Sequence, residues 1–572
     1  MKFSALAAGF ERLEATTKRL EMFDILADIF RESSAEEIAE VIYLLQGQLL
    51  PPYKGVEMGM SEKLLMRAIS NASGVDVREV EGHFKESGDL GKTAESLMEG
   101  EGVGLSVAEV FGYLMDIARA SGEGSVERKV HSLAELLSKA SRKGRKYIAR
   151  FVIGRLRLGV GDPTVMEGLC IAKSDRGFRP ELERAYNLCS DLGHVAEKLF
   201  REGEDGVRGI KVQVGYPIRM ALCERLPSAE EIVKKIGRCG VEAKYDGFRT
   251  QVHKDGDDVE IFSRNLERTT PMFPEIAAAA RRLRAKTAIF EGEALAYNES
   301  TGELLPFQVT VQRKRKHGVE EMAKEYPLKL FAFDLLYLDG VDYTKRPFQE
   351  RRDKLEELIS DEVIAPSDII VTEDPKEVKE YFEEEVERGL EGIVAKRLDA
   401  PYSAGARNFN WIKLKRSYRG ELADTIDLCI VGYFRGRGLR AKFGIGAVLG
   451  AVYDPKEDSF KTVSKVGSGF TEEGWVELRG TLDEIALDHK PARVDSLVEP
   501  DVWVEPRYVI TVTADEITRS PMHTAGKTET ESGYALRFPR AQGEIRGDKR
   551  AEDANTVDEI IEMFNLQRRV EA

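Results

Sequence analysis

The chain has 572 residues, of which 42% are hydrophobic and 32% are charged, and its formal net charge is −15. A chain of this length is expected to form about three to four domains, each with its own core. The composition is typical of a globular protein, the first residues lack the apolar core of a signal peptide, and no apolar run approaches the roughly 18 residues of a membrane span. These features predict a cytoplasmic protein. The negative charge argues against indiscriminate binding of nucleic acids unless basic residues are concentrated locally.

The five cysteines are odd in number, and no two of them form a Cys-x-x-Cys pair. Their number and scatter imply neither a disulfide framework nor a zinc finger. The positions are Cys170, Cys189, Cys223, Cys239 and Cys429.

Residues 1–210 are predicted to form an all-helical domain, because apolar residues recur there at helical spacing. Within it, Asp-Leu-Gly occurs twice ahead of a helical pattern, at Asp89 and at Asp191. An aspartate at this position can cap the exposed amides of a helix, and a helix start can also face an anion such as phosphate. The sequence leaves both interpretations open.

A local excess of basic residues lies between residues 128 and 157, where Glu135 is the single acidic residue. Most basic runs are solvated faces, but this one stands against an acidic background, which favours a surface that follows nucleic-acid phosphates. The residues are Arg128, Lys129, Lys139, Arg142, Lys143, Arg145, Lys146, Arg150, Arg155 and Arg157.

Two further domains are predicted after a glycine-rich linker at 201–215. Residues 211–420 mix strand-like and helical segments, which predicts an α/β or α+β domain. Residues 421–572 are nearly all strand-like between glycine turns, which fits a small Greek-key barrel of the oligonucleotide-binding (OB) type. Helices are expected at 273–285, 350–359, 375–388 and 471–484 and at the C-terminal end.

Lys244 stands at the end of a strand-like run, Val-Glu-Ala-Lys, and an Asp-Gly turn follows it. A lysine amine has a pKa of about 10.4, and partial burial among other cations lowers that pKa and makes the amine a nucleophile. Later strand-like runs supply such cations at Lys396, Lys413 and Lys415. Taken alone, Lys-x-Asp-Gly also fits a surface lysine beside a turn, so the choice between a nucleophile and a surface lysine depends on the motifs that follow.

Several motifs follow one another in a fixed order: KYDGFR (244–249), SRN (263–265), FEGEALAY (290–297), FAFDLLYLDG (331–340), EGIVAK (391–396), NWIKLK (410–415) and ALRFPR (535–540). Together they resemble the successive motifs of the covalent nucleotidyltransferases. The helical front domain and the segment 503–523 narrow the resemblance to the ATP-dependent DNA ligases of the archaeal and eukaryotic replicative type, over essentially the whole chain.

The resemblance implies a role for each matching residue. Lys244 would attack the α-phosphate of ATP, Glu242 would meet the adenine, and Phe333 would offer the base an aromatic face. Glu391 would hold Mg²⁺ and Glu293 would accept from the ribose hydroxyls or join the metal site. Sugar and phosphate contacts are implied for Arg249, Arg264, Arg407, Lys413 and Lys415, and contacts to the pyrophosphate for Arg537 and Arg540.

The resemblance therefore implies a ligase that seals 5′-phosphate, 3′-hydroxyl nicks in double-stranded DNA through a lysine–AMP intermediate, with ATP and Mg²⁺, as a monomer in replication, repair and recombination. An RNA ligase, an mRNA capping enzyme and a non-catalytic nucleic-acid-binding protein are the alternatives. Some archaeal relatives carry a sliding-clamp peptide ahead of 105–111, but this chain has Glu-Gly-Glu-Gly-Val-Gly there. Clamp binding at that place stays open, as do the preferred metal and the use of ADP.

Overall fold

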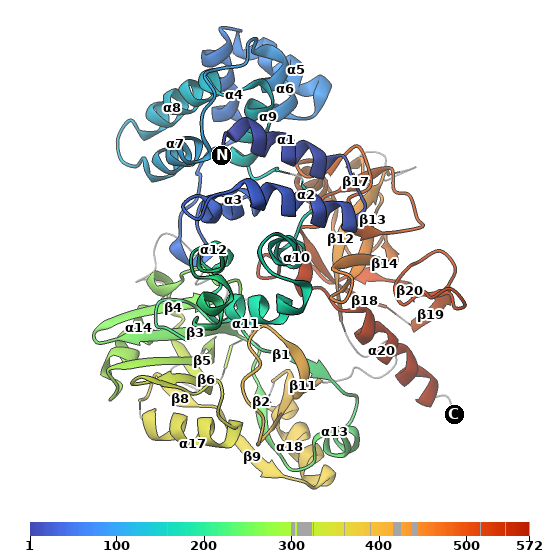
Figure 1. Cartoon of the computed structure of the whole chain (residues 1–572). Helices are drawn as coiled ribbons and strands as arrows, with labels where there is room; N and C mark the ends of the chain where they lie inside the picture. The colour runs from blue at the N-terminus through green and yellow to red at the C-terminus, as the bar shows by residue number, and fades with distance from the viewer. Residues whose placement is uncertain are drawn as a thin grey trace.

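The computed structural model describes residues 1–156, 158–298, 304–305, 310, 323, 325–359, 361–388, 390–415, 425–436, 443–514, 516–543 and 545–570. Three regions follow one another along the chain (Figure 1): a helical region, a middle region of strands and helices, and a β-rich C-terminal region. Among the described residues, no helix is long and apolar enough to cross a membrane.

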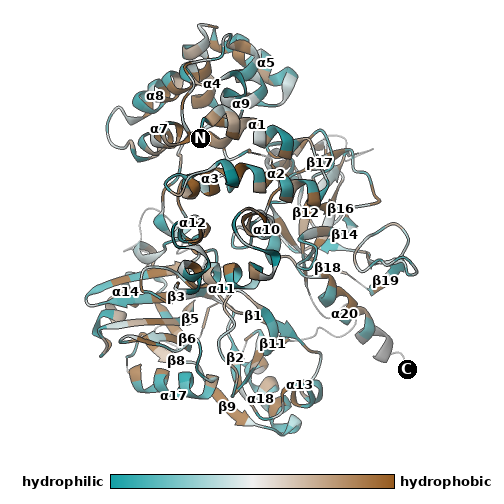
Figure 2. Cartoon of the chain, viewed as in Figure 1, coloured by the Kyte–Doolittle hydropathy of each residue, from teal (hydrophilic) through white to brown (hydrophobic). Residues whose placement is uncertain are grey.

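The helical region has one continuous apolar core, and α9 is buried on all sides from Gly144 to Val152. In α7 the buried residues Val107, Val110, Phe111 and Leu114 recur at helical spacing, and Figure 2 shows apolar and polar residues alternating along these helices. The helices are α1 (Phe3–Glu14), α2 (Arg19–Glu32), α3 (Ile38–Leu45), α4 (Glu62–Ser73), α5 (Val77–Ser87), α6 (Leu90–Leu97), α7 (Val107–Arg119), α8 (Ser125–Lys139), α9 (Arg142–Val152), α10 (Asp162–Lys173), α11 (Arg179–Cys189) and α12 (Leu192–Arg208).

Both Asp-Leu-Gly segments are helix caps whose aspartates bind protein groups. Asp89 accepts a hydrogen bond from Gly91 N at 2.8 Å, and Asp191 accepts one from His194 N at 2.9 Å. Asp89 also binds the Arg150 guanidinium, while Asp191 accepts the hydroxyl of Tyr43 at 2.8 Å. The structure therefore favours the capping interpretation over an open anion site at these two helix starts.

Part of the basic segment 128–157 is buried, which corrects its interpretation as one phosphate-binding surface. Arg145 is 2% exposed and donates to Met98 O at 2.6 Å. Arg150 is 1% exposed and forms ion pairs with Asp89 and Glu14, and Glu14 also binds Lys146 at 2.8 Å. These three cations stabilise the helical region internally because acids distant in sequence neutralise them or carbonyls bind them. Arg142 remains exposed, and Arg157 lies outside the described residues.

Substitution of Arg150 by methionine should destabilise the helical region by about 3–5 kcal/mol, because it leaves buried acids without their shared cation. Exposed Arg142, on the same helix, is the matched control, and Arg142→Met should change stability by no more than about 0.5 kcal/mol. Thermal unfolding followed by the helical circular-dichroism signal measures both. Equal midpoints for the two variants would contradict the structural role of Arg150.

The middle region contains two sheets. The first has the strand order β1-β11-β10-β2-β9, and the second has the order β4-β3-β5-β6-β7, with β8 paired to β6. The strands are β1 (Leu222–Arg225), β2 (Cys239–Lys244), β3 (Phe248–Asp255), β4 (Asp258–Ser263), β5 (Thr287–Ala296), β6 (Leu328–Leu338), β7 (Val341–Asp342), β8 (Ile364–Pro366), β9 (Ile369–Thr372), β10 (Gly392–Arg397) and β11 (Arg407–Lys415). The helices are α13 (Ala229–Ile236), α14 (Pro274–Arg282), α17 (Phe348–Leu358) and α18 (Pro375–Glu387), and the last three confirm the expected helices.

The chain passes from one sheet to the other directly after Lys244, where β2 ends and β3 soon begins. Gly247 lies in this turn, and a Cβ atom there would stand 2.5 Å from Ala294 O of β5. The turn therefore needs glycine because the backbone approaches β5 closely. In the first sheet, β2 runs antiparallel to β10 with Lys244 opposite Gly392, which brings Glu391 to the end of β2.

The C-terminal region contains a sheet with the strand order β15-β17-β12-β13-β14-β16, and β18 joins this sheet by pairing with both β12 and β21. The strands β19 and β20 form a separate hairpin. The strands are β12 (Ile426–Phe434), β13 (Ala447–Asp454), β14 (Ser459–Val466), β15 (Ala486–Leu487), β16 (Val494–Asp495), β17 (Val502–Val504), β18 (Val509–Thr513), β19 (Glu516–Ser520), β20 (Gly533–Arg537) and β21 (Arg540–Ala541). The helices α19 (Glu472–Asp483) and α20 (Val557–Val570) confirm the two expected there.

The C-terminal region packs against the helical region around Asp458, whose side chain is 3% exposed. Its carboxylate binds Arg19 at 3.0 Å and accepts a hydrogen bond from the Thr164 hydroxyl at 3.0 Å, while Arg493 of the C-terminal region binds it at 2.6 Å.

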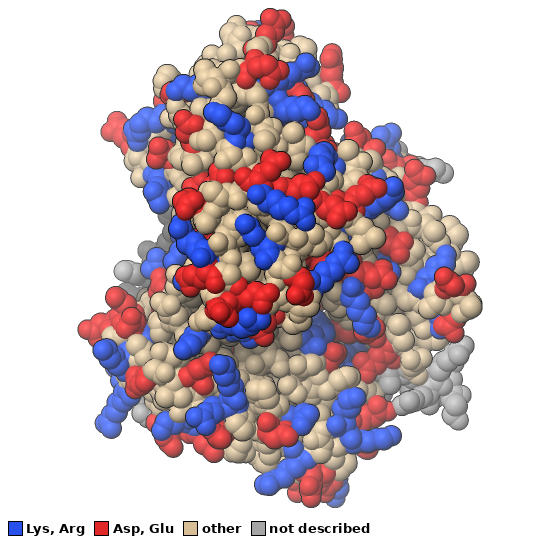
Figure 3. Space-filling model, in the orientation of Figure 1, with Lys and Arg blue, Asp and Glu red and all other residues tan. Residues whose placement is uncertain are grey.

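Figure 3 shows acidic and basic side chains interspersed over the visible face. The domain boundaries predicted near 210 and 420 stay predictions. The last helix of the helical region, α12, ends at Arg208, and the first strand of the middle region, β1, begins at Leu222.

Candidate active site

A cavity of about 320 Å³ lies between the middle region and the C-terminal region. It brings together most of the residues that the sequence singles out, although they come from both sheets of the middle region. Those that line it are Glu242, Lys244, Arg249, Arg264, Glu293, Phe333, Glu391, Lys396, Arg407, Lys413 and Lys415.

Lys244 stands at the end of β2 and forms an ion pair with Glu391. Burial lowers the pKa of the Lys244 ammonium, but the carboxylates of Glu391 and Glu293 outweigh burial and leave that pKa raised. The expectation that neighbouring cations depress this pKa is therefore wrong for the chain without a nucleotide. Lys396 and Lys413 face other acids, Glu242 and Glu559.

Glu391 lies between two lysines, Lys244 and Lys415, and each of its carboxylate oxygens is paired with one of them. Burial by itself raises the pKa of this carboxyl, but the two ammonium groups hold it well below its usual range. Glu391 is therefore a fully ionised oxygen donor that orients the Lys244 amine. An ionised carboxylate of this kind also suits a hard divalent cation.

Glu293 of β5 is the second acid near Lys244. Burial raises the pKa of Glu293 to about 7, and Lys244 and Arg249 only partly oppose the shift. The described residues contain no group of three or more acids, histidines or cysteines that could hold a metal ion. Magnesium at nucleotide sites is commonly held by one or two carboxylates together with phosphate oxygens, and the carboxylates of Glu293 and Glu391 match that number.

Arg249 and Phe333 form one wall of the cavity together with Trp411, which sequence reasoning did not single out. The Arg249 guanidinium lies 5.4 Å from the Phe333 ring centre and 5.5 Å from that of Trp411. It donates to Glu291 at 2.9 Å and to Ala221 O at 2.8 Å. Both terminal nitrogens of the Arg249 guanidinium therefore bind protein groups. Arg249 thus has a structural function in addition to any contact with a sugar or phosphate.

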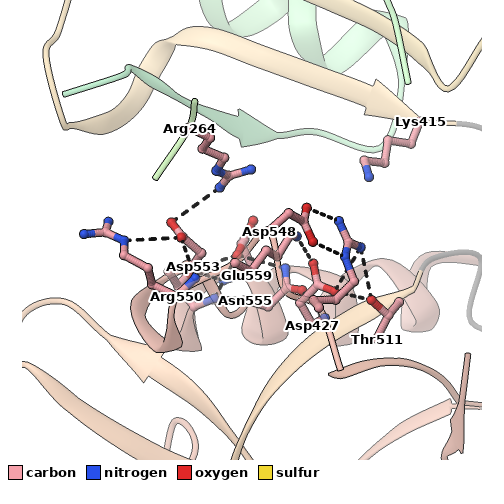
Figure 4. Close-up of polar contacts among 12 residues, drawn as sticks. Arg264, Lys415, Asp427, Thr511, Asp548, Arg550, Asp553, Asn555 and Glu559 are labelled. Carbon is pink, nitrogen blue, oxygen red and sulfur yellow. Dashed lines mark hydrogen bonds and ion pairs between the residues drawn. The ribbon is translucent and has the colours of Figure 1, made fainter. Parts of the chain in front are cut away.

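Several cations of the middle region that line the cavity face acids of the C-terminal region, as Figure 4 shows for Arg264. Glu559 of α20 binds Arg407 at 2.5 Å and lies 3.5 Å from Lys413. Asp553 lies 3.5 Å from Arg264. Burial, Arg407 and Lys415 lower the pKa of Lys413 to about 8, although Glu559 opposes them. Carboxylates thus occupy the positions beside these cations that phosphate groups could take.

Three family models match successive parts of the chain: DNA ligase N terminus over residues 2–170, ATP dependent DNA ligase domain over 220–415 and ATP dependent DNA ligase C terminal region over 441–549. The chain is 56% identical over 572 residues to the probable DNA ligase of Dictyoglomus thermophilum, across 100% of this chain and 98% of that protein. The chain belongs to the ATP-dependent DNA ligase family. It is also 45% identical to the DNA ligase of Staphylothermus marinus, across 99% of each chain. The prediction of an ATP-dependent DNA ligase is confirmed.

Two predicted site residues of this ligase, Arg537 and Arg540, are not among the residues that line the cavity. Both are exposed, and the Arg537 side chain lies 3.8 Å from Glu516 on the neighbouring strand. Between them, Phe538 is 64% exposed and has a φ of 50°. The residues of the C-terminal region that line the cavity include Arg546, Asp548, Lys549 and Glu559. No contact with the nucleotide was predicted for these four residues from the sequence.

The raised pKa of Glu293 predicts a pH dependence of stability for the ligase without a nucleotide. Between about pH 4.5 and 7 the folded chain holds a proton on Glu293 that the unfolded chain has released, so the free energy of unfolding falls as the pH rises through this window. The Glu293→Gln variant should lose this part of the fall. Urea unfolding of both proteins at pH 5 and pH 7.5 measures it, and identical pH dependences would contradict the shift.

Proposed function

We propose that Lys244 is the nucleophile of this ligase and carries AMP between ATP and a DNA nick. The observation that supports this is its position at the end of β2, in a cavity with Glu391 on its amine and the cations Lys413 and Lys415 nearby. The Lys244 amine, once deprotonated, forms a bond to the α-phosphorus of ATP, and pyrophosphate leaves with the electrons of the broken P–O bond. The 5′-phosphate of the nick then takes the AMP from Lys244, and the 3′-hydroxyl finally displaces AMP to form the phosphodiester.

Two groups of residues that line the cavity support an orientation of the nucleotide. The aromatic end, with Phe333 and Trp411, suits the base, and the cationic end, with Arg264, Arg407 and Lys413, suits the phosphates. The carboxylate of Glu293, which also lines the cavity, can accept hydrogen bonds from ribose hydroxyls. Glu391 and Glu293 would hold Mg²⁺, which neutralises charge on the phosphates when it is bound.

We assign the middle region to the nucleotidyltransferase fold and the C-terminal region to the OB fold, with domain boundaries near 210 and 420. The strand pairs of the C-terminal region, including β18 with both β12 and β21, support a partly closed barrel. The helical domain would hold the duplex by its phosphates, since a nick can have any sequence. Clamp binding and the monomeric state remain predictions.

The C-terminal domain would move during the reaction. Arg537 and Arg540 lie outside the cavity while Glu559 and Asp553 face its cations, so contacts between the arginines and ATP require the domain to turn. The pairs that Asp458 makes with Arg19 and Thr164 must also open if the duplex enters between these domains. Hinge motions of this kind are common in enzymes that close over a substrate.

Sealing of a nicked duplex with ATP and Mg²⁺ tests the proposal. We expect sealing of a DNA nick and much weaker sealing when both strands at the nick are RNA. Preferred sealing of RNA would favour the RNA ligase alternative, and failure to seal either substrate while binding DNA would favour a non-catalytic protein.

A further inference from the structure

The side chain of Glu242 lies between two cations beneath the aromatic end of the cavity. It is 2% exposed and forms ion pairs with Lys396 at 2.6 Å and with Arg352 at 3.2 Å. The Ser367 hydroxyl donates to the same oxygen as Arg352, Oε1, at 3.1 Å. A buried carboxylate is costly unless such partners surround it, so this arrangement fixes both the position and the charge of the group.

Arg352 comes from α17, outside every motif that the sequence analysis used. Its guanidinium donates to the Ser367 hydroxyl at 2.8 Å and to the Ser367 carbonyl at 2.6 Å, and its Nε donates to Glu356 at 2.6 Å. Arg352 is 5% exposed, whereas the Glu356 side chain is 49% exposed. The guanidinium is therefore held at several points and presents one nitrogen, Nη1, to Glu242.

Lys396 connects the same carboxylate to the aromatic wall. Its ammonium donates to Phe333 O at 2.9 Å and lies 4.8 Å from the Phe333 ring centre and 4.3 Å from that of Trp411. Two donors thus occupy Oε1 of Glu242, while within the described residues Lys396 is the partner of Oε2. A carboxylate oxygen can accept two hydrogen bonds, so Oε2 retains one acceptor position.

Glu242 and Lys244 are two residues apart on β2, so their side chains leave the strand on the same face. When Lys244 lies at the α-phosphate of a nucleotide, the base end of that nucleotide lies toward Phe333 and Trp411, beside which Glu242 is held. An ionised carboxylate accepts and cannot donate. It therefore suits the exocyclic amine of adenine and repels the carbonyl oxygen that guanine carries at the same ring position.

We propose that Arg352 is a positioning residue for base selection: together with Lys396 it holds the Glu242 carboxylate as an acceptor at the purine edge and so makes the ligase choose adenine over guanine. The inference rests on the proposed function of Lys244. It adds a residue of α17 that does not itself touch the nucleotide and acts through Glu242.

The test compares self-adenylation with self-guanylation in the full chain, using α-labelled ATP and α-labelled GTP. Arg352→Met should raise the KM for ATP about tenfold with little change in kcat, and should lower the ratio of kcat/KM for ATP over GTP by about the same factor. Arg352→Lys keeps a cation near Glu242 and should recover part of the ratio. Sealing of a nick supplied already adenylated should fall less than self-adenylation does, because selection between ATP and GTP has then passed.

Two neighbouring variants separate positioning from general damage to α17. Glu356→Gln removes the exposed partner of Arg352 and should leave the nucleotide ratio unchanged. Ser367→Ala removes one neutral donor from Glu242 and should lower the ratio less than Arg352→Met does. An unchanged ATP-to-GTP ratio in a folded, labelled Arg352→Met protein would overturn the inference, and so would an equal loss in Glu356→Gln. Absence of labelling in the unsubstituted chain would instead overturn the proposed function.

Discussion

Substitution of Lys244 by alanine should abolish the covalent label that α-phosphate-labelled ATP leaves on the denatured protein. The amine of Lys244 is the group that would form the P–N bond, and no other group takes its place in the proposed reaction. The label in the unsubstituted protein should be acid-labile and base-stable, as expected for a phosphoramidate. Denaturing gel electrophoresis after incubation with Mg²⁺ measures both proteins.

The matched control for this variant is Lys254→Ala. Lys254 is also a buried strand lysine, 2% exposed, but it donates to the carbonyls of Gly256 and Arg281 and does not line the cavity. This control should keep the label if it folds. Labelling of Lys244→Ala at the unsubstituted level would show that the nucleophile lies elsewhere.

Which lysines of the site share a strand face could be predicted from the sequence, because the two-residue period of a strand determines it. Alternating residues put Glu242 and Lys244 on one face of β2, and the same rule puts Lys413 and Lys415 on one face of β11; all four line the cavity. The antiparallel register of β2 and β10 then brings Glu391 to Lys244. This register joins segments about 147 residues apart along the chain, and periodicity alone does not give it.

The partners of buried charges could not be predicted, because they are distant in sequence. Glu559 binds Arg407, which precedes it by 152 residues. Arg150 binds Glu14 at the end of α1 and Asp89, which caps the start of α6. Counting charges in the segment 128–157 therefore overestimated its free basic surface. Arg352 was missed for the same reason. The sequence of α17 does not show that Arg352 forms an ion pair with Glu242, which lies 110 residues earlier.

Substitution of Arg540 by alanine should separate the steps of the reaction. Arg540 lies outside the cavity in this structure, so it can reach ATP only after the C-terminal domain has turned and Glu559 has left Arg407 and Lys413. In the proposed reaction, arginines at the pyrophosphate act only while pyrophosphate leaves. Self-adenylation should therefore fall on the order of 100-fold or more, as when other donors to a transition-state charge are removed, whereas a nick supplied already adenylated should still be sealed.

Both reactions should be measured on the same preparation of the Arg540→Ala variant. The point substitution is a cleaner test than a truncated chain ending near Thr530, because the truncation would remove β20 and β21 and so disturb the fold of the C-terminal region. Arg519→Ala is the matched control: Arg519 lies on β19 of the same region and pairs with Glu531 at 2.9 Å, away from the cavity. It should keep both activities. If pre-adenylated nicks fail in Arg540→Ala as badly as labelling by ATP does, then Arg540 acts beyond the first step, and the proposed turn of the C-terminal domain does not divide the reaction in this way.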